Sequence, residues 1–311
     1  MPNYNGSAYL TESIRSVLAQ TYREWELLLV DDRSTDDSVA VAKNTAAGDE
    51  RISILRNEQD AKGGSVCRNI GLRKASGEFL IFMDSDDLLE PDCLAGRVRV
   101  MEQGGVEAAV FAMGTFQDQV GDMPSVWRPI KLHALELFPS HRLPWSVMSP
   151  IWRREFVLRQ DGFDERYPSP QDPEFHTRCL LDPEFRLEVY PDVIDIHYRL
   201  AVPSTGTTHL AKLEPTIDGF RLFLDEFYEK VDDSEGIQNG KGMLFLSLFS
   251  AIERLCRAYR EGGIDRKTLT EYSEQLLQGR LCQSGFDWWT GVIRAYRWLF
   301  GYLSLPARGS N

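Results

Sequence analysis

The chain has 311 residues, of which 42% are hydrophobic and 26% are charged, and it carries a formal net charge of −12. This composition is typical of a globular protein with one large domain or two smaller ones. The acidic balance argues against binding to duplex DNA or RNA, because such binding needs a basic surface.

The cysteines and the apolar runs indicate a cytoplasmic protein. The five cysteines are scattered, without a Cys-x-x-Cys pair, which fits neither a zinc site nor a disulfide framework and favours a reducing compartment. No apolar run reaches the length of a membrane span, and the N-terminus lacks the charged-then-apolar pattern of a signal peptide.

Helix and strand patterns alternate along the first hundred residues. Apolar residues recur at helical spacing from Leu10 to Leu18, with Ser7 as a candidate N-cap. The buried strands that the apolar runs predict are 25–30, 52–55, 79–83 and 106–113. The helices between them are predicted at 36–47, at 64–75 and after Pro91. This alternation predicts a doubly wound α/β sheet, in which ligands bind at the carboxyl ends of the strands.

The start of the chain lacks the strand that normally opens such a sheet. Residues 1–6 read Met-Pro-Asn-Tyr-Asn-Gly, a loop-like stretch without an apolar run. We therefore expect no strand before the first helix, and we expect the true first strand to lie upstream of Met1. The alternative is a sheet with one strand fewer, which would leave an unpaired inner edge.

The second half of the chain changes from an irregular to a helical pattern. Residues 114–150 contain Pro, Gly and Trp without a clear period. The elements predicted next are a turn at 162–164, a helix at 173–181 and a strand at 186–199. From about residue 215 the apolar spacing is helical throughout. These changes predict an α/β domain at residues 1–210 and a helical region at residues 211–311.

The strongest candidate site is the run Asp84-Ser85-Asp86-Asp87, directly after a predicted buried strand. Carboxylates at a buried strand end are costly unless they are paired or bound to a cation. Magnesium or manganese, held by one or two carboxylates and by substrate phosphates, is the usual solution. The alternative is a solvated turn or a helix cap, in which Asp is also common.

A second acidic segment, at residues 30–36, follows the predicted strand at 25–30. Either Asp31 or Asp32 could accept a hydrogen bond from a nucleobase or from a ribose hydroxyl. The alternative is a capping segment, because Thr35 or Asp36 would cap the next helix in any case. Local features alone give the two interpretations similar weight.

Two segments near helix starts complete the candidates. Gly63-Gly64 open a helix that carries Arg68, which could stack on a base, pair with a phosphate or form a salt bridge to an acidic cluster. Further on, Asp172 could be a general base or only the N-cap before Pro173, and local features favour the cap. His176 is predicted to be structural or exposed rather than a ligand.

In this order and spacing, the candidate segments resemble the family 2 glycosyltransferases of GT-A fold. The resemblance covers about the first two-thirds of the chain. The matching segments are Pro2-Asn-Tyr4-Asn5-Gly, Ser16-Val-Leu-Ala-Gln20-Thr-Tyr22, Leu29-Val-Asp-Asp-Arg-Ser-Thr-Asp36, Arg68-Asn-Ile-Gly71, Ala75-Ser-Gly77-Glu-Phe-Leu-Ile-Phe-Met-Asp-Ser-Asp-Asp87, Gly162-Phe-Asp164-Glu and Gln171-Asp172. The joint pattern is highly specific although each part is not. The resemblance implies a GT-A-type doubly wound mixed sheet, its first strand missing or truncated, with a C-terminal helical extension.

The resemblance also implies roles for the candidate residues. The donor nucleotide would contact Pro2, Tyr4, Asn5, Asp31 or Asp32, Arg68 and Asp84. Asp86, together with Asp87, would hold a divalent metal, Mn²⁺ or Mg²⁺, on the donor diphosphate. Asp172 would be the general base for the acceptor hydroxyl.

The implied activity is that of an inverting, metal-dependent, hexosyltransferase-like enzyme of polysaccharide or glycolipid synthesis. It would move a sugar from a nucleoside diphosphate sugar, with a UDP-sugar favoured, to a glycan or a lipid-linked acceptor. The alternative is a catalytically inactive module that binds a nucleotide sugar or a glycan. Two departures from the family pattern bear on this choice. Gln171 stands where Glu is frequent, and Ala201 stands where the family has His. His197 and His209 are nearby in the sequence but do not align with that family position.

The C-terminal segment 286–303 combines aromatic residues at helical spacing with Arg294 and Arg297. Residues 251–311 hold nine Lys or Arg and six Asp or Glu, a balance of +3. The pattern favours packing on the core or in a homodimer over a peripheral contact with the inner face of the cell membrane.

Overall fold

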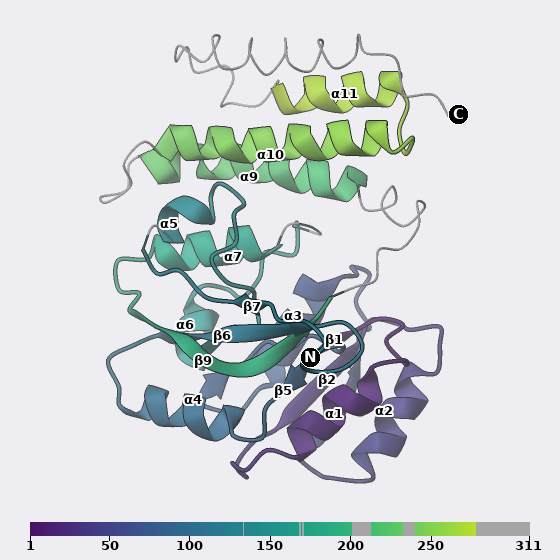
Figure 1. The fold of residues 1–311 in the computed structure, drawn as a ribbon, viewed down its shortest axis with the longest axis vertical. Helices are drawn as coiled ribbons and strands as arrows, with labels where there is room; N and C mark the ends of the chain where they lie inside the picture. The colour runs from purple at the N-terminus through teal and green to yellow at the C-terminus, as the bar shows by residue number, and fades with distance from the viewer. Residues whose placement is uncertain (133, 168, 170, 201–212, 233–239, 278–311) are drawn as a thin grey trace. The chain divides into compact units, whose positions relative to one another are not determined.

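The computed structural model describes residues 1–132, 134–167, 169, 171–200, 213–232 and 240–277 (Figure 1). It divides into two compact units. The first contains Met1–Ala134 and Leu143–Val202, and the second contains Leu135–Arg142 and Pro203–Asn311.

The first unit begins with three parallel strands in the order β1-β2-β3. These strands are β1 (Pro2–Asn3), β2 (Leu27–Asp31) and β3 (Ile52–Arg56). The connecting helices are α1 (Leu10–Leu18) and α2 (Ser38–Ala46), and α3 (Gly64–Lys74) follows β3. The predicted alternation is confirmed here, because the apolar run of β2 is buried and α1 buries Leu10 and Ile14.

The expectation that no strand precedes the first helix is wrong for Pro2 and Asn3. The two residues form β1, in which Pro2 pairs with Val30 and Asn3 with Asp31. Backbone and side-chain hydrogen bonds make this pairing: the Asp32 N–H donates to the Asn3 carbonyl at 2.8 Å, and Asn3 Nδ2 donates to Asp31 Oδ1 at 3.0 Å. A hydrophobic pattern cannot reveal a strand that is held by polar groups.

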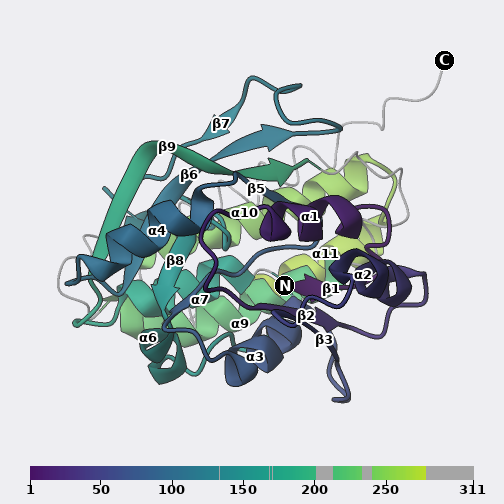
Figure 2. The same ribbon diagram turned by 90° about the horizontal axis from the view of Figure 1, so that it is seen from below.

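A mixed sheet of six strands forms the rest of the first unit. Its order is β4-β8-β6-β9-β5, with β7 paired to β6. The strands are β4 (Phe79–Leu80), β5 (Leu88–Leu89), β6 (Ala108–Phe116), β7 (Val126–Trp127), β8 (Pro150–Arg153) and β9 (Leu187–Arg199). Because β6 is parallel to β9 and antiparallel to β8, the predicted mixed α/β class is confirmed. Figure 2 shows β2 and β3 on one side of this unit and β6, β8 and β9 on the other.

Several boundaries differ from the sequence-based expectation. The strand predicted at 79–83 is shorter, since β4 ends at Leu80, and the irregular stretch 114–150 contains β7 and a short helix, α5 (Ala134–Leu137). Ser7 is not the N-cap of α1, because its N–H donates to Asp36 Oδ2 at 3.1 Å and the helix begins without a side-chain cap. The remaining helices of this unit are α4 (Cys93–Glu102), α6 (Arg154–Arg159) and α7 (Gln171–Leu180).

The described part of the second unit contains three long helices that pack side by side (Figure 1). They are α9 (Leu213–Asp232), α10 (Gly240–Arg260) and α11 (Arg266–Leu277). Phe220 and Leu224 of α9 and Leu248 and Leu255 of α10 are buried, as their helical spacing predicts. None of the helices in the described ranges combines the length and apolar character needed to cross a membrane. The predicted aromatic segment 286–303 lies outside the described residues.

Candidate functional site

The segment after β1 lies against the segment after β2, at the carboxyl ends of both strands. The Thr35 N–H donates to Asn5 Oδ1 at 2.8 Å, and the Asn5 N–H donates to Ser34 Oγ at 2.9 Å. Asn5 has φ 51°, a left-handed conformation that Asn tolerates. Tyr4 is 57% exposed next to it, which leaves its ring accessible to a ligand, and Pro2 lies half-buried in β1.

Asp31 and Asp32 are buried, and both carboxylates organise the surrounding loops. Asp31 accepts from Asn3 Nδ2 and from the Ser34 N–H, each at 3.0 Å. Asp32 accepts from Asn57 Nδ2 at 2.6 Å and from the Gly63 N–H at 2.8 Å. Asp31 thus bonds to β1 and to the turn after β2, and Asp32 bonds to the residue before α3 rather than to the start of α2. The base contact stays a prediction for either residue.

The capping alternative for this segment holds in part. The Ser38 N–H, at the start of α2, donates to Asp36 Oδ1 at 3.0 Å. The N-cap position itself is Asp37, whose side chain makes no capping bond. Asp36 therefore satisfies one backbone donor of the helix start, while Asp31 and Asp32 remain outside this role.

The acidic run Asp84–Asp87 lies next to the segment after β1. A Cβ atom added to Gly6 would lie 3.2 Å from Ser85 Oγ, which shows how closely the two segments approach. Asp86 is partly exposed, whereas Asp87 is 0% exposed and accepts from the Arg199 N–H at 2.7 Å. The two predicted metal ligands therefore differ in access, and Asp86 is the one that a ligand can reach.

The carboxylates of the acidic run lie close together and largely out of water, so their negative charge is unfavourable unless a cation offsets it. Burial, reinforced by Asp84, raises the pKa of Asp86, and burial with Asp84 and Asp86 raises the pKa of Asp87 to about 9. Asp87 Oδ2 is buried and has no hydrogen-bond partner among the described residues. A divalent cation would relieve this charge, and carboxylate oxygens are the ligands that Mg²⁺ and Mn²⁺ prefer.

The described residues contain no group of three or more His, Cys, Asp or Glu side chains placed to hold a metal ion by themselves. The acidic run instead fits a cation that takes one or two protein carboxylates and completes its coordination with substrate phosphates. The residues thus fit the divalent cofactor that the family resemblance implies.

Arg68 connects the acidic run to the start of α7. Its Nη2 forms an ion pair with Asp84 Oδ1 at 2.7 Å, and its Nη1 donates to Gln171 Oε1 at 2.6 Å. The guanidinium also lies over the ring of Phe163 at 5.3 Å. The salt-bridge alternative for Arg68 is therefore what the structure shows, and this one side chain brings the candidate metal site and the candidate base together.

Asp172 is not the N-cap of α7, although local features favour that role. The helix begins at Gln171, and Asp172 Oδ2 accepts from the Val147 N–H at 3.1 Å. The carboxylate thus bonds to a turn 25 residues upstream rather than to its own helix. Asp172 is half-buried, and burial raises its pKa, an effect that Arg68 opposes and Asp84 reinforces. A carboxylate with a raised pKa is suited to general base catalysis.

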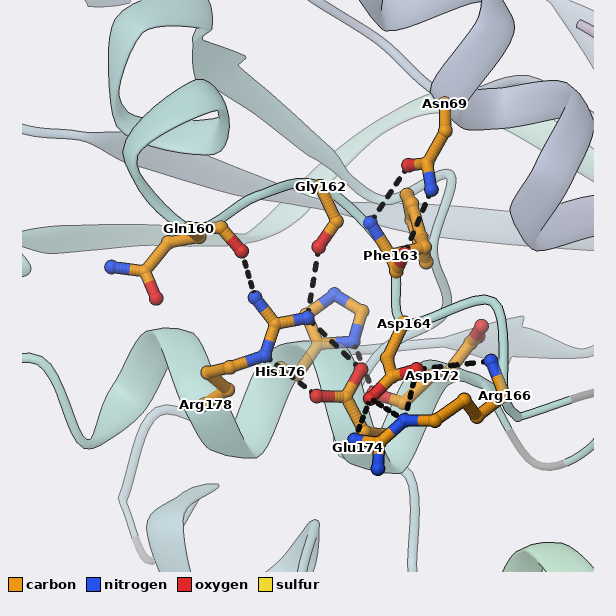
Figure 3. A network of polar contacts seen from close by, with 10 residues as sticks. All are labelled: Asn69, Gln160, Gly162, Phe163, Asp164, Arg166, Asp172, Glu174, His176 and Arg178. Atoms are coloured by element: carbon orange, nitrogen blue, oxygen red, sulfur yellow. Dashed lines mark hydrogen bonds and ion pairs between the residues drawn. The ribbon is translucent and has the colours of Figure 1, made fainter.

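The turn before α7 is held by Arg178, as Figure 3 shows. Its guanidinium donates to the carbonyls of Gln160 and Gly162, the latter at 2.8 Å, and forms an ion pair with Glu174 at 2.6 Å. Gly162 has φ 67°, a conformation that favours glycine. This clamp joins the turn to the helix that carries Asp172.

Asn69 of α3 fixes the same turn from the other side (Figure 3). Its amide donates to the Phe163 carbonyl at 2.8 Å and accepts from the Phe163 N–H at 2.9 Å. The motifs Arg68-Asn69 and Gly162-Phe163-Asp164, which the sequence offered only as resemblance, are therefore parts of one scaffold. Spacing alone could not have shown this, because the partners lie 94 residues apart.

The histidines near the candidate site are structural where the structure describes them. His176 is buried beside Trp145 and Trp152, its Nδ1 lies 2.8 Å from the Asp172 carbonyl, and burial lowers its pKa to about 3. Of the two predicted alternatives, structural or exposed, the burial of His176 supports the structural one. His197 bonds to Glu90 at 2.5 Å, and Ala201 and His209 lie outside the described residues.

The sequence profile of one family, Glycosyl transferase family 2, matches residues 1–162, about half of the chain. The chain belongs to glycosyl transferase family 2. The predicted family is thereby confirmed.

Curated relatives match over a shorter region. The chain is 39% identical over 117 residues to an Escherichia coli protein named UDP-Glc:alpha-D-GlcNAc-diphosphoundecaprenol beta-1,3-glucosyltransferase WfgD, covering 38% of this chain and 44% of that protein. It is 33% identical over 114 residues to the GalNAc(5)-diNAcBac-PP-undecaprenol beta-1,3-glucosyltransferase of Campylobacter jejuni, covering 37% of this chain and 36% of that protein. The chain therefore spans less than half the length of these curated relatives.

Solved structures show the same fold at low sequence identity. Residues 1–349 of S. aureus TarS, in complex with UDP-GlcNAc, superpose with a TM-score of 0.61 and 17% identity, covering 94% of this chain and 90% of that one. The mannosyltransferase PcManGT of Pyrobaculum calidifontis, in complex with GDP-Man and Mn²⁺, gives a TM-score of 0.53 and 20% identity, covering 96% and 86%. The GT-A fold predicted from the sequence is confirmed.

Proposed function

We propose that this glycosyltransferase moves a sugar from a nucleoside diphosphate sugar, with a UDP-sugar favoured, to a hydroxyl group of a glycan or lipid-linked acceptor, with inversion at the sugar carbon. The observation that carries the proposal is the double contact of Arg68 with Asp84 and Gln171. This contact keeps the acidic run close to the start of α7, which supports a site at which donor and acceptor meet for a single displacement.

In this mechanism the donor nucleotide binds at the carboxyl ends of β1 and β2. The exposed ring of Tyr4 offers a surface on which a base can stack, while Asn5 and Asp31 keep the surrounding turn in place. Asp172 takes the proton from the acceptor hydroxyl as that oxygen attacks the sugar carbon. The electron pair of the broken bond leaves with the nucleoside diphosphate.

We assign Asp86 to hold the divalent cation. Asp87, the next residue in the chain, is buried. When bound, the cation supplies positive charge beside the diphosphate as negative charge develops there. The neighbour with GDP-Man and Mn²⁺ supports the use of such a cation in this fold.

The acceptor class rests on the relatives. The names of two curated relatives specify acceptors linked to undecaprenol, and the structural neighbour TarS is solved with UDP-GlcNAc. A lipid-linked acceptor would bring this protein to a membrane surface, which would favour the peripheral contact that the sequence pattern of segment 286–303 made the second choice after core or homodimer packing.

Calorimetry of UDP and GDP binding, with and without Mn²⁺, tests the donor and metal assignments. We expect the wild-type chain to bind UDP more tightly in Mn²⁺, and we expect Asp86→Ala to abolish the gain that Mn²⁺ provides. The control is Asp192→Ala, which removes an exposed carboxylate that forms an ion pair, 3.6 Å long, with Arg128. A wild-type chain that binds neither nucleotide would refute the proposal, and UDP binding without sugar transfer would favour the inactive module.

Gln171→Glu is expected to move the acid limb of the pH–rate profile to higher pH. The new carboxylate would lie beside Asp172 and would share Arg68 with Asp84, so it would raise the pKa of Asp172 further. Because the base acts only when deprotonated, the variant would lose activity at a higher pH than the wild type does as the solution is acidified. Transfer rates between pH 4 and pH 9 measure the shift. An acid limb at the same pH as in the wild type, or at a lower pH, would argue against Asp172 as the titrating group.

A further inference from the structure

Arg199, at the end of β9, forms hydrogen bonds with two residues of the acidic run. Its side chain is 6% exposed, and its Nε donates to the Asp86 carbonyl at 2.9 Å. Its backbone N–H donates to Asp87 Oδ1 at 2.7 Å. One residue therefore fixes two consecutive residues of the run from a strand that lies 112 positions further along the chain.

The other two nitrogen atoms of the guanidinium also bond to protein, and two aromatic rings lie close to the group. Nη1 donates to the Gln117 carbonyl at 3.2 Å, just after β6, and Nη2 pairs with Glu12 of α1 at 2.6 Å. The ring centres of Phe116 and Tyr9 lie 4.3 Å and 4.6 Å from the guanidinium carbon. A planar group with donors in a fixed fork can make these three bonds while it packs between two rings, whereas a lysine ammonium cannot.

We infer that Arg199 is a positioning residue, which sets the orientation of Asp86 through its carbonyl and thereby controls how tightly the site takes the divalent cation and the donor diphosphate. This inference rests on the proposed function. Arg199 does not contact the donor in it, because all three nitrogen atoms of its guanidinium donate to protein and the group also packs against two aromatic rings. Residues that hold a ligand-bearing group in place typically change metal affinity by about 10–100-fold when they are replaced.

UDP calorimetry on Arg199→Lys, in a series of Mn²⁺ concentrations, tests the inference. We expect UDP affinity in saturating Mn²⁺ to fall by about 10-fold or more, while UDP affinity without metal stays at the wild-type value. The matched control is Arg51→Lys, since Arg51 also pairs with an aspartate, Asp49, and stacks on a ring, that of Trp25, but touches neither the acidic run nor α7. Arg51→Lys should bind UDP as the wild type does.

Glu12→Gln gives a second measurement should Arg199→Lys fail to fold. Glu12 is on the surface side of the network, with its side chain 58% exposed, and the glutamine keeps an acceptor for Nη2 without its charge. We expect a smaller loss in the same direction, again only in the presence of Mn²⁺. Wild-type affinity in both variants, or an equal loss with and without Mn²⁺, would overturn the inference. Failure of the wild type to bind UDP in Mn²⁺ would instead refute the proposed function.

Discussion

Asp172→Asn is expected to lower the rate of sugar transfer by about 10²–10⁴-fold, the range typical for removal of a general base. The asparagine side chain has the shape of aspartate, and its oxygen can still accept from the Val147 N–H, so the start of α7 should keep its place. The variant loses the negative charge of the carboxylate and with it the ability to take a proton. Initial rates of transfer from a UDP-sugar, measured beside UDP calorimetry, separate chemistry from donor binding.

The control for this variant is Asp182→Asn, just after the far end of α7. Asp182 bonds to Gln160 and to the Glu184 N–H, away from the acidic run, so its replacement should leave the transfer rate near the wild-type value. Transfer by Asp172→Asn at a wild-type rate would require a different base. Loss of Mn²⁺-dependent UDP binding in the same variant would mean that Asp172 also supports the donor site.

The elements that the sequence predicted well are those whose hydrophobic pattern lies within a single helix or strand. The apolar runs that became β2, β3 and β6 and the helical spacing of α9 and α10 depend on side chains within one element. Burial of such runs dominates the choice of local structure, so the pattern and the fold agree. The hydrophobic pattern did not predict the strand β1, because its two residues, Pro2 and Asn3, are held by hydrogen bonds rather than by apolar packing.

The candidate site was predicted as a set of residues but not as a geometry. Resemblance supplied Asp84, Asp86 and Asp172, yet the contacts that unite them come from Arg68 and Arg199, whose partners lie up to 187 residues away along the chain. The cap prediction for Asp172 failed for the same reason. Its competing donor, the Val147 N–H, is supplied by a turn that no local rule connects to α7.

Arg97→Met is expected to lower the free energy of unfolding by about 3–5 kcal/mol, the cost of leaving a buried charge without its partner. Arg97, in α4, is 0% exposed and forms two bonds with Asp195 of β9, at 2.8 Å and 2.7 Å. Removal of the cation would leave the Asp195 carboxylate in an apolar surrounding. Urea denaturation followed by tryptophan fluorescence measures the difference.

Two further variants show whether the pair or the packing carries this effect. Arg97→Met combined with Asp195→Leu should recover most of the loss, because a buried ion pair replaced by apolar side chains is often close to neutral. Arg159→Met breaks an exposed pair with Glu184, 3.9 Å long, and should cost less than about 1 kcal/mol. A double variant as unstable as Arg97→Met would instead assign the loss to the bond from Arg97 Nη1 to the Met148 carbonyl at 3.1 Å. In that case Arg97 would stabilise the turn whose Val147 N–H holds Asp172, and its loss should also lower the transfer rate.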